Sequence, residues 1–443
     1  MEVPLLPGLC LVVVTVTLSM YTSGLQKEPA LTRSRHAFLP LAVAFCLAAA
    51  TFAPALAEVT AGPEGLAFYD IPDPLPAGEA GSVLRARALD GTMALPSAAR
   101  NTLVMYQSRD PSGAPVAVTG TVSVPKGVPP ATGWPVITWT HGTTGLAAVC
   151  GPSRDTDTGP EHGYIEVIRG LLDQFVAQGY AVVATDYQGL GTGGFHPFLQ
   201  GQPNGWNVLD MLRAARSLEP EIGTRYAVMG HSQGGHADLF TAAEGPGDLD
   251  GFDLVGNIAM APGSQIASRL NLVRSSDKVE LSVPYVTYVL ISYATTHPEI
   301  ALDRILSAEA ISALPQLYDQ CMTHALTEGH WASAIAKDQF LAQPDLTAFL
   351  GVASQNEPGA LKIAVPTLIL QGDKDVTVFP SATDALAQQL CAGGNDLEYR
   401  VVPGADHDGA MSEGAPVALA WMADRFAGKA SSSNCADLPK AAP

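Results

Sequence analysis

The sequence feature that most constrains the fold is the stretch at 224–237. Its first half, Tyr226–Met229, is short and apolar and predicts a buried parallel strand. The motif Gly230-His231-Ser232-Gln233-Gly234 follows, and a helical pattern begins at His236. A sharp strand-to-helix turn leaves no space for side chains two residues before and after Ser232, and glycine at both positions removes the collisions. The Ser232 hydroxyl is therefore expected to project from a strained turn beside a helix N-terminus.

Strands and helices are expected to alternate on both sides of this turn. Apolar runs predict buried strands at 135–140, 180–186, 254–260, 366–371 and 397–402, and helical spacing appears at 164–178, 206–218 and 417–426. Two alternating strands at 101–108 and 116–124 predict an antiparallel start to the sheet, whereas residues 58–98 show no sustained period and are expected to form a surface arm. The pattern predicts an α/β fold with a mostly parallel central sheet and helices on both faces.

The N-terminal part has the features of a leader. Apolar runs occupy 3–22 and 38–57; a basic stretch precedes the second run, which ends in the small-residue site Ala55-Leu56-Ala57. These are the features of a signal peptide. Residues 1–57 are therefore predicted to be an upstream extension plus a signal peptide, and the mature protein is expected to be secreted or periplasmic.

The strand–helix alternation stops between residues 263 and 360. This segment contains helical stretches and clustered aromatic residues, and the strand pattern resumes only at 366–371. We interpret it as a largely helical cap insertion over the exposed serine; a cap needs a core of its own, so only a few of its residues would line a pocket. The main domain is then expected in two parts, residues 58–262 and residues 361–443 with the C-terminal tail.

Length, composition and charge restrict the classes of function. The chain has 443 residues, of which 47% are hydrophobic, enough for one large α/β domain and an insertion. Its formal net charge is −19, and the predicted leader removes three basic and only two acidic residues. A strongly acidic mature protein repels polynucleotides, so a nucleic-acid partner is not expected.

Four cysteines remain after the predicted leader. They are Cys150, Cys321, Cys391 and Cys435. An even number in an exported protein predicts two disulfides, for which three pairings exist. No C-x-x-C or H-x-x-x-H cluster indicates a metal site, so no metal is expected.

A serine nucleophile requires a base to take its proton and an acid to hold that base. Two aspartates follow the strand at 366–371. Asp375 has the G-x-x-D-x-x-V spacing of the acid, whereas Asp373 is closer to the strand end and is expected to be a turn residue. His407 is the only histidine beyond them, in a loop after the last strand. Ser232, Asp375 and His407 are therefore predicted to form a catalytic triad at the carboxyl edge of the sheet.

A tetrahedral intermediate needs two donors for its oxyanion. One is expected from the backbone N–H of Gln233, directly after the nucleophile. The other is expected from Thr143, in the loop that follows the strand at 135–140, while His141 is expected to hold this loop in shape. A serine mechanism of this kind needs no cofactor. A second serine motif, at 410–414, lacks the first glycine and has no strand directly before it, so Ser412 is not expected to act.

Several motifs together resemble one family. They are Trp139-Thr140-His141-Gly142-Thr143-Thr144-Gly145, then Cys150 with Pro152, then Asp186-Tyr187-Gln188-Gly189-Leu190-Gly191, and Gly230-His231-Ser232-Gln233-Gly234-Gly235. The chain resembles the bacterial branch of the secretory lipase family, which is related to fungal lipase A, from about Phe68 to Cys435.

The resemblance implies an α/β-hydrolase core with a helical cap, the same Ser232–Asp375–His407 triad, and ester hydrolysis on acyl chains. It also implies the disulfide pairs Cys150–Cys321 and Cys391–Cys435. Fungal members carry an acidic residue where Thr143 stands, so the oxyanion donors are expected to differ in side-chain detail. The leader extension is outside the pattern.

The function predicted from the sequence is that of a secreted serine lipase or carboxylesterase that acts through an acyl-enzyme. Its expected partners are small-molecule or lipid esters, with lipid-interface contact through the cap. Two alternatives remain. One is an acyltransferase, or a hydrolase of polyesters or other bulky esters, on the same triad. The other is a catalytically silent hydrolase fold that acts as a binding protein.

Overall fold

The computed structural model describes residues 60–438, and the predicted leader lies outside them. Its centre is a nine-stranded sheet in the order β1-β2-β3-β5-β4-β6-β7-β8-β9. Strands β1, β2, β3 and β5 pair antiparallel, and β5, β4, β6, β7, β8 and β9 pair parallel. The strands are β1 (Val83–Ala88), β2 (Ala98–Arg109), β3 (Pro115–Pro125), β4 (Trp134–Thr140), β5 (Ala181–Thr185), β6 (Ile222–His231), β7 (Asp253–Met260), β8 (Thr367–Gly372) and β9 (Leu397–Val402). The predicted mostly parallel sheet with an antiparallel start is confirmed.

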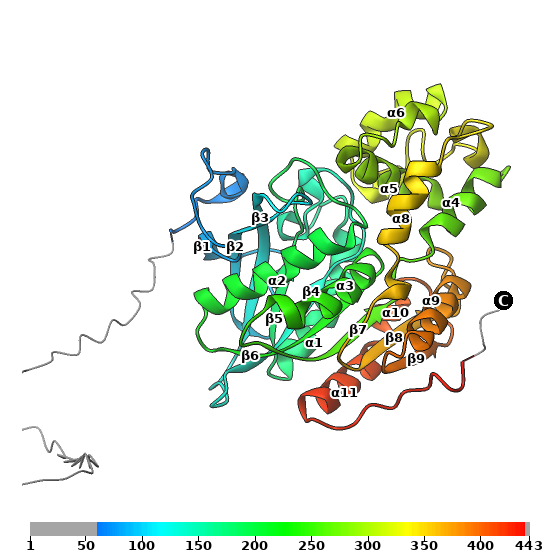
Figure 1. Cartoon of the computed structure of the whole chain (residues 1–443). Coiled ribbons are helices and arrows are strands. Elements are labelled where there is room, and N and C mark those ends of the chain that lie inside the picture. Colours follow the sequence, from blue (N-terminus) through cyan, green and yellow to red (C-terminus); the bar gives the residue numbers. More distant parts are fainter. Residues whose placement is uncertain (1–59, 439–443) are drawn as a thin grey trace, which may run out of the picture. The chain divides into compact units, whose positions relative to one another are not determined.

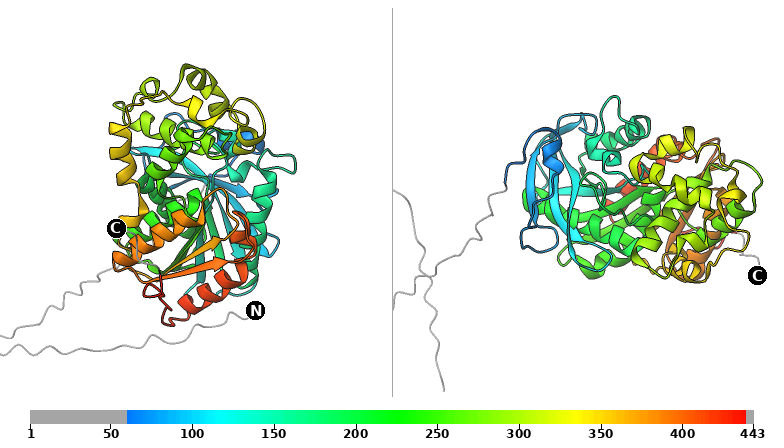
Figure 2. Two further views of the ribbon diagram at one scale, coloured as in Figure 1. Left: turned by 90° about the vertical axis from the view of Figure 1, so that its right-hand side faces the viewer. Right: turned by 90° about the horizontal axis from the view of Figure 1, so that it is seen from above.

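Helices cover both faces of this sheet (Figures 1 and 2). One face packs against α1 (His162–Ala177), α10 (Gly409–Ser412) and α11 (Ala415–Phe426), and the other against α2 (Gly201–Leu218), α3 (Gln233–Asp248) and α9 (Pro380–Ala392). The period of two along each strand explains the two cores. In β5, Val182 and Ala184 enter the first core, whereas Ala181 and Val183 enter the second. A strand buried on both faces has a continuous run of apolar residues, and this run is what predicted β5 from the sequence.

The predicted surface arm at 58–98 is wrong in part. Residues Val83–Ala88 form β1, which pairs antiparallel with β2 at the edge of the sheet. Every residue of β1 is intermediate or exposed, since it alternates small or apolar residues with Arg85 and Arg87. Its backbone pairing with β2, rather than a buried face, places it in the sheet, so hydrophobic periodicity gave no signal for it.

Helix α2 begins earlier than the sequence indicated, at Gly201 instead of Trp206. The extra turn contains Pro203, Asn204 and Gly205, which are weak helix formers. All three are buried, and α2 packs along α3. This turn is therefore helical because of its tertiary packing, although its residues have low helix propensity.

Five α-helices occupy the segment between β7 and β8, which we call the helical insertion (residues 263–360). They are α4 (Ile266–Ser275), α5 (Ser282–Thr296), α6 (Ala308–Asp319), α7 (Met322–Thr327) and α8 (Thr347–Gln355), drawn in green to yellow in Figure 1. The insertion has a separate hydrophobic core in which Tyr288, Tyr293, Trp331 and Phe349 are fully buried. Its clustered aromatic residues therefore mainly stabilise the insertion itself.

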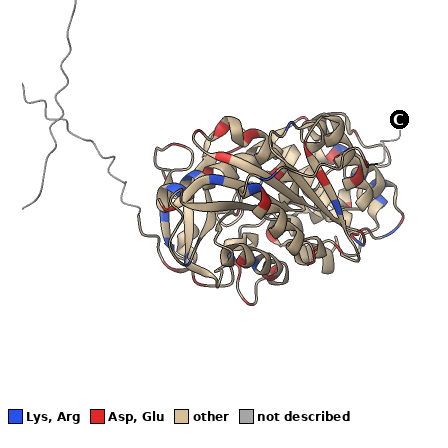
Figure 3. Ribbon diagram, turned by 90° about the horizontal axis from the view of Figure 1, so that it is seen from below, with Lys and Arg blue, Asp and Glu red and all other residues tan. Residues whose placement is uncertain are grey.

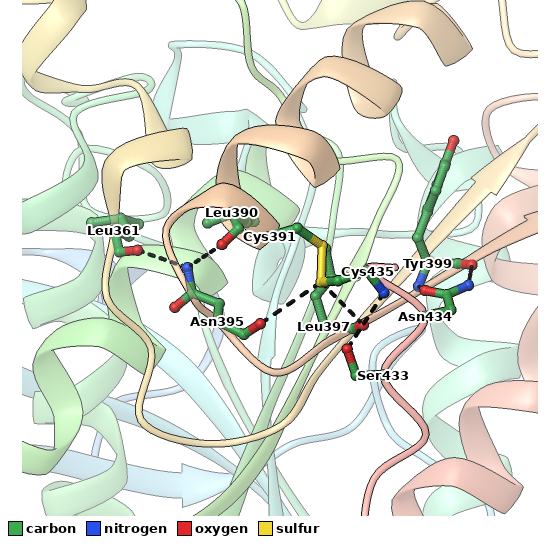
Figure 4. The surroundings of a disulfide bond; sticks show 9 residues. All are labelled: Leu361, Leu390, Cys391, Asn395, Leu397, Tyr399, Ser433, Asn434 and Cys435. Carbon is green, nitrogen blue, oxygen red and sulfur yellow. Dashed lines mark hydrogen bonds between the residues drawn. A yellow bond between two sulfur atoms is a disulfide. The ribbon is translucent and has the colours of Figure 1, made fainter. Parts of the chain in front are cut away.

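The structure contains the two disulfides that the family resemblance implies. Cys150 of the core joins Cys321 of the insertion, and Cys391 at the end of α9 joins Cys435 of the C-terminal tail. Figure 4 shows the second bond and its surroundings. Beside it, the Asn434 side chain accepts a hydrogen bond from the Tyr399 N–H at 2.9 Å and donates one to the Tyr399 carbonyl at 2.8 Å. The tail is thus attached along β9.

Basic residues gather at one end of the sheet, while acidic residues are spread over the described elements (Figure 3). Strands β1 and β2 contain Arg85, Arg87, Arg100 and Arg109. Several of these arginines are paired with carboxylates: Arg87 with Glu64, Arg100 with Glu219 and Glu221, and Arg109 with Asp210 and Asp248. The pairing offsets part of the basic charge on this edge. Within residues 60–438, no helix combines the length and the apolar character needed to cross a membrane.

Candidate active site

The turn between β6 and α3 holds Ser232 in a strained backbone conformation. Its φ is 58° and its ψ is −117°, a region that residues other than glycine rarely adopt. The flanking glycines are explained by Thr140, the last residue of β4. A Cβ on Gly230 would collide with the Thr140 hydroxyl, and a Cβ on Gly234 would collide with the Thr140 carbonyl. The close approach of β4 therefore requires both glycines of the motif.

Backbone hydrogen bonds hold this turn against the end of β7. The Ser232 N–H donates to the Met260 carbonyl at 2.9 Å, and the Ser232 carbonyl accepts from the N–H groups of His236 at 3.0 Å and Gly263 at 2.9 Å. The residue is only 7% exposed. Among residues 60–438 the Ser232 hydroxyl makes no hydrogen bond, and it lines a cavity described below. A strained, well-anchored backbone of this kind is the geometry expected at a nucleophile turn.

Asp375 and His407 meet above the ends of β8 and β9. The His407 Nδ1 lies 2.7 Å from the Asp375 Oδ2. The carboxylate also accepts from the backbone N–H groups of Thr377 and Val378, both at 2.8 Å, and from the Gln371 side chain at 3.0 Å.

These donors keep the carboxylate of Asp375 ionised. Burial alone would raise its pKa, but the hydrogen bond and charge of His407, together with the two backbone donors, lower the pKa below its ordinary value. An ionised partner makes the His407 Nδ1 the donor. The lone pair of the neutral imidazole is then on Nε2, where it can take a proton.

Asp373 has a different role from Asp375. Its carboxylate accepts a 2.7 Å hydrogen bond from the backbone N–H of Gly404, in the loop that carries His407. The N–H of Lys374 donates to the Ala405 carbonyl of the same loop at 2.9 Å. Asp373 therefore connects the two loops as a turn residue, and in this structure Asp375 is the aspartate that contacts His407.

The predicted oxyanion donors, Thr143 and Gln233, both line the cavity beside Ser232. Within the described part of the chain, neither backbone N–H donates a hydrogen bond to another protein group. His141 lies behind the loop of Thr143 and is 1% exposed. Its ring nitrogens face the carbonyls of Gly142 at 2.7 Å and Asp186 at 3.2 Å. These contacts fit the expectation that His141 shapes the loop.

A cavity of about 330 Å³ opens beside Ser232 between the core and the helical insertion. Its lining is mostly apolar. The insertion contributes Ile266, Leu272, Val286, Val289 and Phe349, and the core contributes Phe198, Leu199, Val378 and Phe379. One basic side chain, Arg269, also lines it; this guanidinium lies 4.2 Å from the centre of the Phe379 ring and donates to the Thr377 carbonyl. Apolar walls of this kind suit an acyl chain.

The helical insertion is attached to the loop of Thr143 at α7. The disulfide Cys150–Cys321 lies at the start of this helix, and the Met322 N–H donates to the Thr144 carbonyl at 2.9 Å. Glu161, just before α1, accepts from the Thr323 N–H at 2.7 Å and from the Thr323 hydroxyl at 3.1 Å. The position of Thr143 therefore depends on contacts with α7.

Removing the Cys150–Cys321 disulfide is expected to reduce both stability and turnover. The bond closes a chain separation of 171 residues, and loop-closure entropy for that length gives about 5 kcal/mol of the free energy of unfolding. Replacing both cysteines with alanine also frees the loop of Thr143, so kcat is expected to fall. Urea denaturation and esterase kinetics measure the two effects.

The other disulfide provides the matched control. Cys391–Cys435 closes a separation of 44 residues, for which the same model gives about 4 kcal/mol, but it lies away from the loop of Thr143. Its double alanine variant is expected to lose stability and keep kcat. Equal kcat in the two double variants would contradict the link between α7 and the loop of Thr143.

Glu161 is expected to make stability depend on pH. Burial raises the pKa of its carboxyl from 4.5 to about 7, because the hydrogen bonds from Thr323 only partly offset the loss of solvent. Because the pKa of Glu161 is higher in the folded state, its carboxyl makes its full contribution to the free energy of unfolding at pH values below its pKa in the unfolded chain. That contribution is lost as the pH rises through its pKa in the folded state. Between about pH 5 and pH 7 the wild type should lose about 1–2 kcal/mol of its free energy of unfolding relative to Glu161→Gln. Urea denaturation at each pH measures it, and a difference independent of pH would contradict the assignment.

Sequence reasoning missed two side chains that contact this site. Gln371 donates to Asp375 and accepts from the Thr383 hydroxyl at 2.6 Å; a polar residue at the end of an apolar strand was the available signal. Tyr164, in the first turn of α1, contacts Gly142 and His231, and no sequence pattern marked it. Of the other histidines, His236 contacts the Asn356 carbonyl at 2.7 Å, whereas His324 and His330 belong to the helical insertion.

The part of the chain that the structure describes contains no group of three or more His, Cys, Asp or Glu side chains arranged to hold a metal ion. Ser232, the Asp375–His407 pair and the unengaged N–H groups of Thr143 and Gln233 are the kinds of groups that nucleophilic chemistry uses.

Comparison with known proteins decides the family. Residues 165–434 match the model of the family described as secretory lipase. The chain belongs to the secretory lipase family. Among curated relatives, it is 28% identical over 369 residues to a protein of Mycobacterium tuberculosis described as a probable inactive lipase, covering 79% of each chain. It is 24% identical over 394 residues to lipase 4 of Candida albicans, covering 83% of this chain and 82% of that one.

Solved structures of similar proteins show the same fold. Candida antarctica lipase A in its closed state matches with a TM-score of 0.64 at 18% identity, covering 82% of this chain and 86% of that one. The rice cell wall degrading esterase LipA of Xanthomonas oryzae, in a ligand-bound form, matches with a TM-score of 0.62 at 20% identity, covering 77% and 95%. This member of the secretory lipase family therefore has the α/β-hydrolase fold, and its family supports a lipase-type ester hydrolase. The family's designation and the two disulfides are consistent with an extracellular protein.

Proposed function

We propose that this member of the secretory lipase family hydrolyses acyl esters with Ser232 as nucleophile, His407 as general base and Asp375 as its acid partner. One contact carries the proposal. His231, the residue directly before Ser232, donates from Nε2 to the His407 carbonyl at 3.0 Å. The loop that bears the base is thereby packed against the turn that bears the nucleophile, while His407 also contacts Asp375.

In the first half-reaction the His407 Nε2 takes the Ser232 proton as Oγ attacks the ester carbonyl carbon. The carbonyl oxygen becomes an oxyanion, for which the N–H groups of Thr143 and Gln233 are the available donors. The C–O bond to the alcohol then breaks, and His407 gives its proton to the leaving alkoxide. The products are a free alcohol and an acyl group bound to Ser232.

In the second half-reaction a water molecule replaces the alcohol. His407 takes a proton from it while the hydroxide oxygen attacks the acyl carbon, and the same two N–H groups face the new oxyanion. Collapse breaks the bond to Ser232, and Oγ recovers the proton from His407. Asp375 remains ionised throughout and stabilises the imidazolium that forms twice in each cycle.

The cavity supports an acyl substrate class. Its walls are mainly aliphatic and aromatic side chains from both the core and the helical insertion. We propose that the insertion acts as the cap of this site and that the acyl chain occupies the space beneath it, with the core formed by residues 58–262 and 361–443.

A catalytically silent binding protein is the second candidate. Two observations favour it: the relative from Mycobacterium tuberculosis is described as inactive, and the Ser232 hydroxyl makes no hydrogen bond among the described residues. Hydrogen bonds of catalytic groups are often long in the absence of substrate, so the second observation does not remove Ser232 as nucleophile.

Covalent labelling separates the two candidates. Purified residues 58–443 are incubated with a p-nitrophenyl alkylphosphonate, which bonds to an activated serine, and the labelled peptide is identified by mass spectrometry. We expect one phosphonylated residue, Ser232, and turnover on a p-nitrophenyl ester series from acetate to palmitate. A folded protein with neither label nor turnover would favour the binding protein, and competition by an added alcohol would indicate acyl transfer.

A further inference from the structure

We propose that Tyr164 and His231 are positioning residues. They join the loop of Thr143, the turn of Ser232 and the loop of His407 through one continuous hydrogen-bond chain. The inference rests on the proposed function of Ser232. Tyr164 is in the first turn of α1, and His231 is the last residue of β6. Neither touches the ester in the proposed mechanism.

The direction of every hydrogen bond in this chain is fixed by its partners. The Gly142 N–H donates to the Tyr164 hydroxyl oxygen at 2.9 Å. That hydroxyl lies 2.8 Å from the His231 Nδ1. The His231 Nε2 lies 3.0 Å from the His407 carbonyl, which can only accept. Nε2 must therefore carry the proton, Nδ1 must accept, and Tyr164 must donate to it.

The protonation states needed for this chain are those that burial favours. His231 is fully buried, and burial together with the positive charge of His407 lowers its pKa well below the ordinary value, so its ring stays neutral. Burial and the charge of Asp408 raise the pKa of Tyr164, so it stays a phenol. The neutral tautomer is therefore maintained beside the imidazolium that His407 forms during the reaction.

The ends of the chain lie next to two different parts of the catalytic machinery. Gly142 directly precedes Thr143, and the His407 carbonyl belongs to the general base itself. The His231 and His407 rings also pack together, with centroids 4.4 Å apart. A Cβ on residue 142 would collide with the Tyr164 hydroxyl, so glycine is required there for the contact. A shift of any member is thus transmitted to both the oxyanion donors and the base.

The test is Tyr164→Phe, which keeps the ring and removes only the hydroxyl. We expect kcat on the best p-nitrophenyl ester to fall by about 10- to 100-fold, because small displacements of catalytic groups have effects of that size, with KM little changed. The ¹⁵N shifts of the His231 ring report the tautomer directly: Nε2–H in wild type, and a changed Nδ1 shift in the variant.

Tyr106→Phe is the matched control. The Tyr106 hydroxyl also makes two buried hydrogen bonds, to the Thr185 hydroxyl at 2.6 Å and the Asn207 carbonyl at 2.8 Å, and it contacts none of Gly142, His231 and His407. It should lose stability and keep kcat. His231→Gln retains a donor for the His407 carbonyl and should retain more activity than His231→Leu.

The outcomes separate this inference from the proposed function. Wild-type kcat in Tyr164→Phe, or an Nδ1–H tautomer of His231, would overturn the inference even if Ser232 is confirmed as nucleophile. If the wild type shows no Ser232-dependent turnover, the proposed function fails, and the His231 tautomer with its response to Tyr164→Phe still decides whether the chain exists.

Discussion

Replacing Ser232 with alanine is expected to lower kcat/KM for the best p-nitrophenyl ester by on the order of 10⁵-fold or more, which is the scale for loss of a serine nucleophile. The change removes Oγ and little else, because that atom makes no hydrogen bond among the described residues. The positive φ of 58° at this position remains as strained for alanine as for serine. Loss of turnover should therefore occur without loss of the fold.

Thermal unfolding and ester hydrolysis of the purified variant measure the two properties together. Ser412→Ala is the control. Ser412 is exposed and lies in the second serine motif, and among residues 60–438 its hydroxyl donates a single hydrogen bond, to the Asp408 carbonyl at 3.5 Å. It should retain wild-type kcat. More than about 1% residual turnover in Ser232→Ala would mean that another group attacks the ester.

The local features of the fold could be predicted because short sequence patterns determine them. The β6–α3 turn depends on two glycines next to Thr140, and the spacing around Asp375 is set by the turn after β8. Parallel strands buried on both faces, such as β5, are visible as apolar runs. Each of these constraints acts within a few residues, so the sequence carries it directly.

The features that were missed depend on contacts between distant segments. Strand β1 has no buried face, and only its pairing with β2 defines it. The pairing of Cys150 with Cys321, which the family resemblance implied and the structure confirms, spans 171 residues, so local residue patterns do not specify it. Tyr164 enters the site because α1 packs beside the loop of Gly142. Such side chains become visible only when tertiary structure places them together.

Replacing Asp375 with asparagine is expected to lower kcat by about 10⁴-fold, the loss seen when the acid of such a triad becomes an amide. The asparagine carbonyl can still accept from Thr377 and Val378. Its NH₂ group would then face the His407 Nδ1 and force that nitrogen to accept. The proton moves to Nε2, where it blocks removal of the Ser232 proton.

Asp373→Asn is the comparison that tests the assignment, since Asp373 precedes Asp375 by two residues in the same turn. In the wild type the Gly404 N–H donates to the Asp373 carboxylate at 2.7 Å, and an asparagine oxygen at 373 can still accept this hydrogen bond. We therefore expect kcat to stay within about threefold of wild type. Steady-state kinetics of both variants, with thermal unfolding to confirm the fold, measures the difference. If Asp373→Asn lost turnover and Asp375→Asn kept it, the assignment of Asp375 would be wrong. Asp373 would then be the acid partner of His407, and the contact between Asp375 and His407 would be structural.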